Sequence, residues 1–195
     1  MANNRVCVGG IDIDNKLSVR LLDDNGCHES ADICLFNIWE IWDVEYVIHN
    51  QRSLPHSEDI RITRKKKSSV LKNEMSMLDF LNKMRFPVSQ GDIHTTFEGK
   101  LKSTNSGTFY ISEDSVPSNS TCFWICDRDI IRKDSFGKIR YRYSDGTRQW
   151  GFAFVGLEED PIPIILQGTL IRLSLAHWWL HDGNKKCFLQ LSGWY

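Results

Sequence analysis

The residues best placed for chemistry lie in a hairpin that the sequence predicts over residues 138–155. Asp145-Gly146 is a strong signal for a two-residue turn between strands. Such a turn makes one face of the hairpin aromatic and the other basic. The predicted cross-strand pairs are Tyr143 with Arg148, Tyr141 with Trp150, Ile139 with Phe152, Arg142 with Gln149, Arg140 with Gly151, and Lys138 with Ala153.

The basic face has small neighbours, so a nucleic-acid phosphate backbone has room to lie against it. The alternative is a solvated outer face, because exposed cations alone rarely identify a site. The nucleic-acid-binding candidates in this hairpin are Lys138, Arg140, Arg142 and Arg148.

Two further groups are candidates for nucleic-acid contact. The basic run Arg64-Lys65-Lys66-Lys67 either contacts phosphate or is a solvated lead-in to a helix. The adjacent residues Trp178 and Trp179 either stack on bases or plug the open end of a barrel. For Trp194, which ends the last predicted strand, plugging is the favoured interpretation.

A zinc site is one interpretation of Cys122, Cys126, His177 and His181, because each pair has three residues between its members. We predict no metal site, since Phe123-Trp124-Ile125 between the two cysteines has the composition of a strand core. No nucleophile elbow, zinc-protease motif or phosphate-binding loop occurs in the chain. We therefore expect no catalytic residue and no cofactor, with a metal-dependent nuclease or hydrolase as an alternative.

Composition limits the kind of binding that is possible. The 195 residues carry a net charge of −1, whereas a general nucleic-acid coat is strongly basic, so any such site must be local. There is no signal peptide at the start and no apolar stretch of about 18 residues. The six cysteines are better interpreted as reduced thiols than as a disulfide frame. These features predict a cytoplasmic protein with no membrane partner.

The hydrophobic pattern predicts a mostly β protein of two small barrel-like halves, residues 1–92 and 93–195. One helix is expected over residues 69–84, capped by Ser68 or Ser69, with apolar residues at helical spacing. Residues 33–48 are interpreted as one long strand or two, with helix as the competing interpretation. The other expected strands are 5–13, 16–22, 95–101, 108–112, 122–126, 170–175 and 186–194.

The order of these segments resembles the dual OB-containing domain family, which is bacterial and often found near defence and mobile-element genes. Two departures are an absent first apolar strand and Arg20-Leu21-Leu22 in place of Ile-Arg-Pro. The segments that carry the resemblance are Arg5–Ile13, Leu17–Leu21, Leu35–Ile41, Pro55–Asp59, Cys122–Cys126, Lys138–Val155 and Leu170–Leu191.

The resemblance implies two OB-like barrels and nucleic-acid binding. The leading hypothesis is a non-catalytic binding module of a bacterial antiviral defence or mobile-element system, with single-stranded nucleic acid as the favoured partner. The alternative is an adaptor that binds the protein encoded by a neighbouring gene, which the near-zero net charge also permits.

Overall fold

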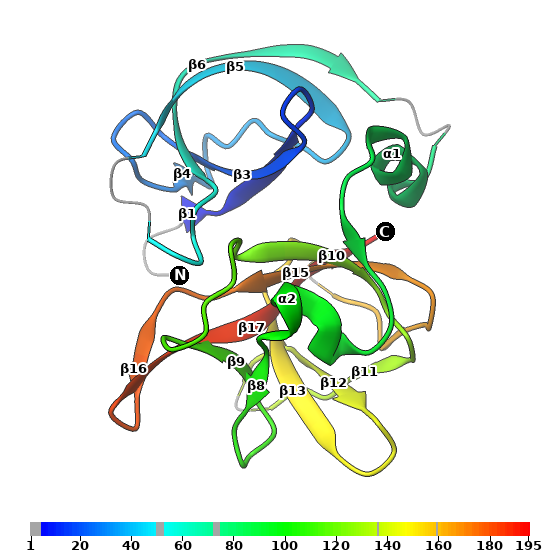
Figure 1. Ribbon diagram of the computed structural model, residues 1–195. Coiled ribbons are helices and arrows are strands. Elements are labelled where there is room, and N and C mark those ends of the chain that lie inside the picture. Colours follow the sequence, from blue (N-terminus) through cyan, green and yellow to red (C-terminus); the bar gives the residue numbers. More distant parts are fainter. Residues whose placement is uncertain (1–4, 50–52, 72–74, 136, 159) are drawn as a thin grey trace. The chain divides into compact units, whose positions relative to one another are not determined.

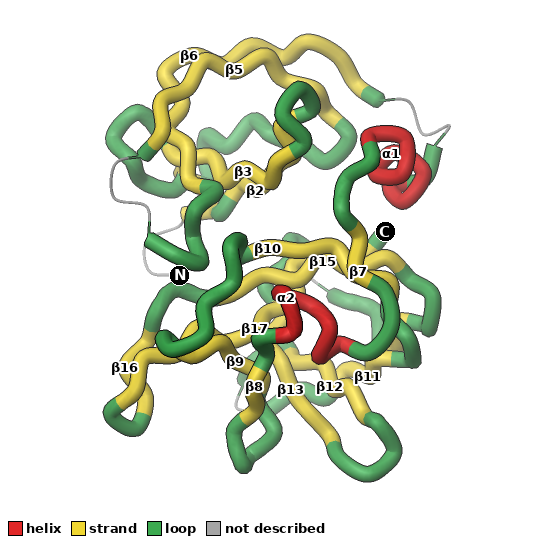
Figure 2. Tube along the Cα trace, viewed as in Figure 1, coloured by secondary structure: helices red, strands yellow, loops and turns green. Residues whose placement is uncertain are grey.

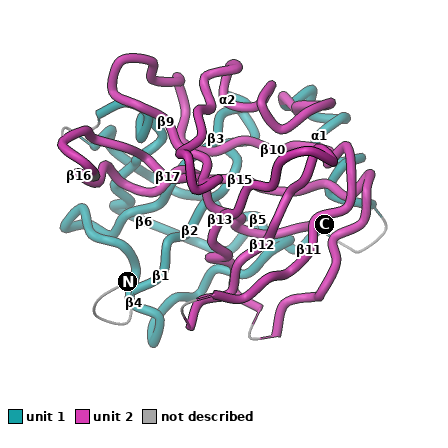
Figure 3. Tube along the Cα trace, turned by 90° about the horizontal axis from the view of Figure 1, so that it is seen from below, with its two compact units in different colours: residues 1–86 teal, residues 87–195 magenta. Residues whose placement is uncertain are grey.

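The computed structural model describes residues 5–49, 53–71, 75–135, 137–158 and 160–195. The chain divides into two compact units, Met1–Phe86 and Pro87–Tyr195, which Figure 3 shows in different colours. The sequence places this boundary six residues later, between 92 and 93. Strands dominate both units, as Figure 2 shows, so the mostly β class is confirmed.

Unit 1 contains one four-stranded sheet in the order β2-β3-β6-β5, in which β3 and β6 are parallel and the other neighbours antiparallel. The predicted first hairpin is confirmed, and the carboxylate of Asp12 closes its turn by accepting from the backbone N–H of Asp14 and Asn15. The elements are β1 (Arg5–Val6), β2 (Val8–Asp12), β3 (Leu17–Leu22), β4 (Glu29–Ser30), β5 (Glu40–Ile48), β6 (Asp59–Val70) and α1 (Met77–Met84) (Figure 1).

The helix predicted over residues 69–84 begins too early. Residues 59–70 form the long strand β6, and α1 begins at Met77, after Ser76, whose hydroxyl accepts from the backbone N–H of Asp79. The basic run is therefore strand, paired across β5 in a register that sets Arg64 against Glu45. Opposite charges on neighbouring strands stabilise such pairing. The same strand pair continues through Ser69 and Val70, which the prediction assigned to the helix, opposite Ile41 and Glu40. In residues 33–48 the regular element is the strand β5, so the helical interpretation is wrong.

A buried ion pair joins β3 to β6 in unit 1. The Arg20 Nε and Nη2 atoms donate to the two Asp59 carboxylate oxygens at 2.5 and 2.8 Å, and the two side chains are 8% and 12% exposed. The apolar core beside it is small, consisting of Leu21, Ile60 and Ile62. Desolvation opposes the charge of Arg20, but hydrogen bonding to Asp59 and nearby negative charge give a net rise in its pKa.

Substituting one member of this pair is expected to destabilise unit 1 strongly. Arg20→Met leaves the Asp59 carboxylate buried without its partner, which costs about 3–5 kcal/mol in free energy of unfolding. Arg20→Met combined with Asp59→Leu is expected to recover most of that loss, because the double variant leaves no buried charge without a partner. Urea denaturation followed by circular dichroism measures both changes.

Arg61→Met on the exposed part of β6 is the control and should change stability by less than about 0.5 kcal/mol. Equal stabilities for Arg20→Met and Arg61→Met would show that the buried pair has no special role.

Unit 2 contains most of the strands and the larger core. Its first elements are β7 (Val88–Ser89), the 3-10 helix η1 (Ile93–Thr95), α2 (Thr96–Gly99), β8 (Lys102–Ser103) and β9 (Phe109–Ser112). Its later strands are β10 (Thr121–Ile125), β11 (Ile130–Arg132), β12 (Arg140–Ser144), β13 (Gln149–Phe154), β14 (Ile164–Ile165), β15 (Leu170–Leu175), β16 (Trp179–His181) and β17 (Asn184–Trp194).

Six strands of unit 2 follow the path β11-β12-β13-β17-β15-β10, and outside this path β14 pairs with β11 and β7 with β10. The pair β13 and β17 is parallel, and the other neighbours on this path are antiparallel. Since β10 and β11 follow each other in the chain, residues 121–132 supply both ends of the path. β15 returns to lie beside β10, which is the order of a Greek key.

The strand expected over residues 95–101 is wrong, because this segment forms η1 and α2 and covers one part of the unit 2 core. Ile93, Phe97 and Leu101 are buried in that core. Asp92 begins the helical segment by accepting from the backbone N–H of His94. The indole N–H of Trp124 donates to Gly91 O at 2.8 Å and holds the segment against β10.

Candidate nucleic-acid interface

The predicted hairpin of β12 and β13 forms, but its register differs from the predicted one by two residues. Tyr143 pairs with Trp150 and Tyr141 with Phe152. The cause is Asp145, which precedes the turn tip instead of occupying it. One of its carboxylate oxygens accepts from the backbone N–H of Thr147 and of Arg148, at 2.8 and 2.7 Å. These hydrogen bonds lower the pKa of Asp145 to about 2.

The division into an aromatic and a basic face survives this shift, because side chains alternate with a period of two. The aromatic face is buried in the core and consists of Tyr141, Tyr143, Trp150 and Phe152. Arg140 and Arg142 lie on the outer face, where they pair across the strands with Ala153 and Gly151. Because Ala153 and Gly151 have small side chains or none, the two guanidinium groups lie over a shallow surface.

The charges of Arg140 and Arg142 are not compensated within the part of the chain that the structure describes, where neither makes an ion pair. Their neighbour Arg132 differs, since it binds both Asp134 and Asp160 at 2.9 Å. Among the described residues, no carboxylate therefore competes with an external anion for Arg140 or Arg142.

The structure places the other two basic candidates of the hairpin apart from this pair. Lys138 is exposed and lies in the connection before β12. Arg148 is exposed at the hairpin tip, and strand alternation puts it on the side of Trp150. Of the four basic candidates, only Arg140 and Arg142 thus occupy regular outward positions on a strand, β12.

The basic run on β6 belongs to unit 1, and most of its cations form ion pairs with carboxylates. Arg64 binds Glu45 at 3.0 Å, Lys65 binds Glu29 at 2.5 Å, and Lys67 binds Glu40 at 2.5 Å. Lys66 is exposed and makes no ion pair with any residue that the structure describes. These pairs neutralise three of the four cations and offer little excess positive charge for phosphate.

A depression of about 450 Å³ opens on the outer face of unit 2 beside Arg140. The depression is open to solvent and not an enclosed cavity. Walls come from the β8–β9 turn and from the segment before β16, and the floor comes from β13 and β17. The lining residues are Thr104, Ser106, Thr108, Arg140, Ala153, Ala176, His177, Trp179, Phe188, Leu189 and Gln190.

The two tryptophans, Trp178 and Trp179, differ in burial. Trp178 is partly buried against the core, whereas Trp179 is 66% exposed and lines the depression. Figure 1 shows the β16–β17 hairpin, which carries Trp179, extending beyond the rest of unit 2. Trp194 packs against the core, with its ring 5.4 Å from that of Phe154.

Strand β17 supplies site residues that the sequence reasoning missed. Cys187, Leu189 and Leu191 are buried, and the intervening Lys186, Phe188 and Gln190 form a row on the opposite face. This row pairs across the strands with Trp179, Tyr110 and Ala153 respectively. The alternation of apolar and polar residues was the signal in the sequence that could have revealed the row.

Of the residues of the zinc interpretation, the structure describes Cys122, Cys126 and His177, and the side chain of His181 lies outside its description. Burial raises the pKa of the Cys122 thiol to about 12, and the Cys126 thiol donates to Leu166 O at 3.0 Å. His177 lines the depression. Among the residues that the structure describes, no group of three or more His, Cys, Asp or Glu side chains could hold a metal ion.

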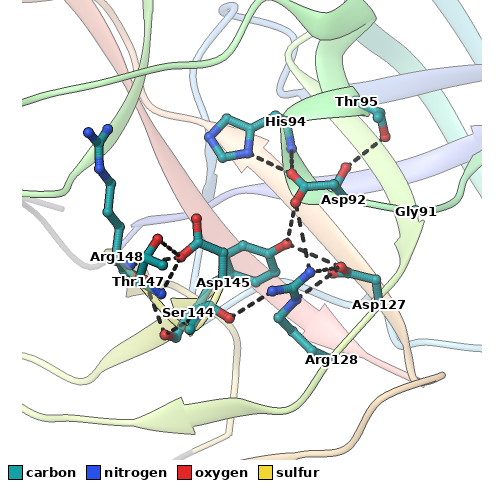
Figure 4. A network of polar contacts seen from close by, with 12 residues as sticks. Gly91, Asp92, His94, Thr95, Asp127, Arg128, Ser144, Asp145, Thr147 and Arg148 are labelled. Atoms are coloured by element: carbon teal, nitrogen blue, oxygen red, sulfur yellow. Dashed lines mark hydrogen bonds and ion pairs between the residues drawn. The ribbon is translucent and has the colours of Figure 1, made fainter.

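A polar network lies at one end of the unit 2 core (Figure 4). The Tyr143 hydroxyl lies 2.9 Å from a carboxylate oxygen of Asp92 and 3.2 Å from one of Asp127. Arg128 binds Asp127 and donates to Ser144 O, while His94 Nδ1 lies 2.6 Å from Asp92. Burial raises the pKa of Tyr143 above its usual range. The network joins the segment before α2 to the hairpin that carries Arg140 and Arg142.

The wall of the depression formed by the β8–β9 turn is fixed to β13 through Gly107. Gly151 N donates to Gly107 O at 2.7 Å, and Thr108 forms a bridge with Gly151. Gly107 has a φ of +76°, and an added Cβ would lie 2.4 Å from Gln149 O. Only glycine fits this close approach, and its neighbours Ser106 and Thr108 line the depression.

Gly107→Ala is expected to destabilise unit 2 and to move this wall, because the backbone of β13 blocks the added methyl group. Gly137→Ala is the matched control, since Gly137 has a φ of +69° and nothing within 4 Å of its added Cβ. Both variants bear a left-handed strain of about 1 kcal/mol, and Gly107→Ala should lose at least about 1 kcal/mol more. Thermal unfolding compares them, and equal losses would show that the contact with Gln149 does not constrain the turn.

The strand order and the outward depression of unit 2 define the class. Residues 121–132, β12 and β13 are three successive segments. β15 returns to lie beside the first segment, at β10, and the last strand, β17, lies beside β13. This order is that of a Greek-key β unit of the OB type. The family model of the Dual OB-containing domain matches residues 1–194, and the chain belongs to this family. This match confirms the family resemblance seen in the sequence.

No curated protein and no solved structure matches the chain. Among the residues described, no helix is long and apolar enough to cross a membrane.

Proposed function

We propose that this protein binds single-stranded nucleic acid in the depression on the outer face of unit 2. The observation that supports this proposal is the presence of Arg140 and Trp179 in one depression, although 38 positions separate them in the sequence. In OB folds, the face of the second and third strands and the loop between the fourth and fifth bind oligonucleotides. Here these elements correspond to β12 and β13 and to residues 176–183.

The chemistry of the depression suits an unpaired strand. The indole of Trp179 offers an exposed aromatic face on which an unstacked base can lie, whereas the bases of a duplex stack on one another. Arg140 and Arg142 offer charge to the phosphates of the same strand. Hydroxyl groups of Thr104 and Ser106 line the opposite wall and can donate to or accept from bases and sugars.

The proposal contains no catalytic step. We further propose that the module acts in the cytoplasm of a bacterium, in an antiviral defence or mobile-element system. That setting is supported by the family resemblance alone. With a net charge of −1, the chain would bind through a local site, so its affinity should depend on few phosphate contacts.

The proposal is tested with two substitutions at the depression. Trp179→Ala removes one stacking surface worth about 1–3 kcal/mol, so affinity for a labelled oligothymidylate should fall roughly 5- to 150-fold. Arg140→Gln removes one phosphate contact, so the slope of log K against log salt should become shallower by about 0.7. Fluorescence anisotropy over a salt series measures both effects.

Arg61→Gln makes the same charge change on exposed β6 of unit 1 and should leave affinity and salt slope nearly unchanged. If the native protein binds no single strand at low salt, or if Trp179→Ala and Arg140→Gln bind as the native protein does, the proposed site is wrong.

A protein-binding adaptor is the second candidate, and one observation favours it. Ile33, Leu35 and Ile38 in the connection before β5 are 52–65% exposed, which is unusual for neighbouring large apolar side chains. A pull-down from the native host after nuclease treatment distinguishes the candidates. A protein retained without nucleic acid supports the adaptor, and nucleic acid recovered without a protein partner supports the binding module.

A further inference from the structure

We infer that the nucleic-acid site continues beyond the first depression along β17, and that Lys186 provides a second phosphate position there. The bound strand would then follow the outward row of β17, past the turn between β8 and β9. This inference rests on the proposed function and specifies how much of a single strand the site accepts.

A second depression of about 380 Å³ adjoins the first. The two share Thr104 and Ser106, so the β8–β9 turn borders both. This turn precedes the Greek-key strands in the chain and is additional to them. The second depression is lined by Ser103, Thr104, Asn105, Ser106, Tyr110, Asp182 and Lys186.

The row on β17 provides a continuous path between the two depressions. Gln190 and Phe188 line the first depression and Lys186 lines the second. Residues two apart on a strand are about 6.6 Å apart, so the row from Gln190 to Lys186 covers about 13 Å. That length exceeds the length of one nucleotide along an extended strand. Since Trp179 is the cross-strand partner of Lys186, a base on the indole lies next to the second cation.

The charge of Lys186 is suited to a phosphate. Its ammonium lies 4.9 Å from the ring centroid of Tyr110, whose ring is in turn 6.3 Å from that of Phe188. Asp182 lines the same depression, yet Lys186 makes no ion pair with any residue in the described ranges. The aromatic ring orients the ammonium without neutralising it.

The wall between the depressions is ordered by its own hydrogen bonds. Thr104 Oγ1 lies 2.9 Å from Ser106 Oγ and accepts from the backbone N–H of Thr108 at 3.0 Å. Asn105, between these two residues, lines the second depression and is exposed. The turn therefore presents hydroxyl and amide groups in a defined position, where they can contact a base or sugar that passes between Trp179 and Lys186.

The test compares a short and a long probe. A labelled oligothymidylate of about 12 nucleotides is long enough to occupy both depressions, whereas a single labelled thymidine nucleotide is shorter than the row from Gln190 to Lys186. Lys186→Gln should bind the long probe several-fold more weakly, with a salt slope shallower by about 0.7. It should bind the short probe as the native protein does.

Lys185→Gln is the matched control, because Lys185 is exposed, adjacent in sequence and on the other face of β17. Its affinity for both probes should equal that of the native protein. If Lys186→Gln and Lys185→Gln bind the long probe equally, or if Lys186→Gln weakens both probes alike, the second phosphate position is wrong.

The two proposals fail differently in this experiment. A native protein that binds neither probe overturns the proposed function and the second position with it. A native protein that binds, and that depends on Arg140 and Trp179 but not on Lys186, overturns the second position alone.

Discussion

Unit 2 depends on the pairing of one long strand. The eleven residues of β17 pair with β13, β15, β9 and β16, so this strand links the hairpin of the basic face to the rest of the sheet. Its inward residues Cys187, Leu189 and Leu191 belong to the core, and its outward residues form the floor of the depressions. Because a strand alternates, the burial that stabilises unit 2 also fixes the direction of its outward row.

The elements around β17 turn this row into a site. Gly107 allows the β8–β9 turn to approach β13, which makes one wall, and the β16–β17 hairpin carries Trp179, which makes another. Arg140 lies over small residues and lacks an intramolecular ion pair among the described residues, unlike the cations of β6. The contrast matters because an anion must displace a carboxylate at Arg64 but not at Arg140. Uncompensated charge beside an exposed aromatic surface is what the proposed function needs.

The sequence predicted the mostly β class, the family and the two faces of the β12–β13 hairpin. The faces were right although the register was not, since an error of two residues keeps every side chain on its face. The position of Asp145 could not be derived from the dipeptide alone, because a carboxylate can cap a turn from the position before it. The helix was placed too early because Ser69 and Val70 pair with Ile41 and Glu40 of β5, a long-range contact that local spacing does not report. Tyr110 was missed for the same reason, as strand pairing alone brings it beside Phe188.

The central claim is that a single strand of nucleic acid lies on the outer face of β12, β13 and β17. An NMR titration of the isotope-labelled protein with an oligothymidylate of about 12 nucleotides tests it most directly. The account predicts that the indole N–H signal of Trp179 and the backbone amides of β13, β16 and β17 shift together as the oligonucleotide is added. Shifts confined to β5 and β6 of unit 1, or no shifts at a low salt concentration, would contradict it.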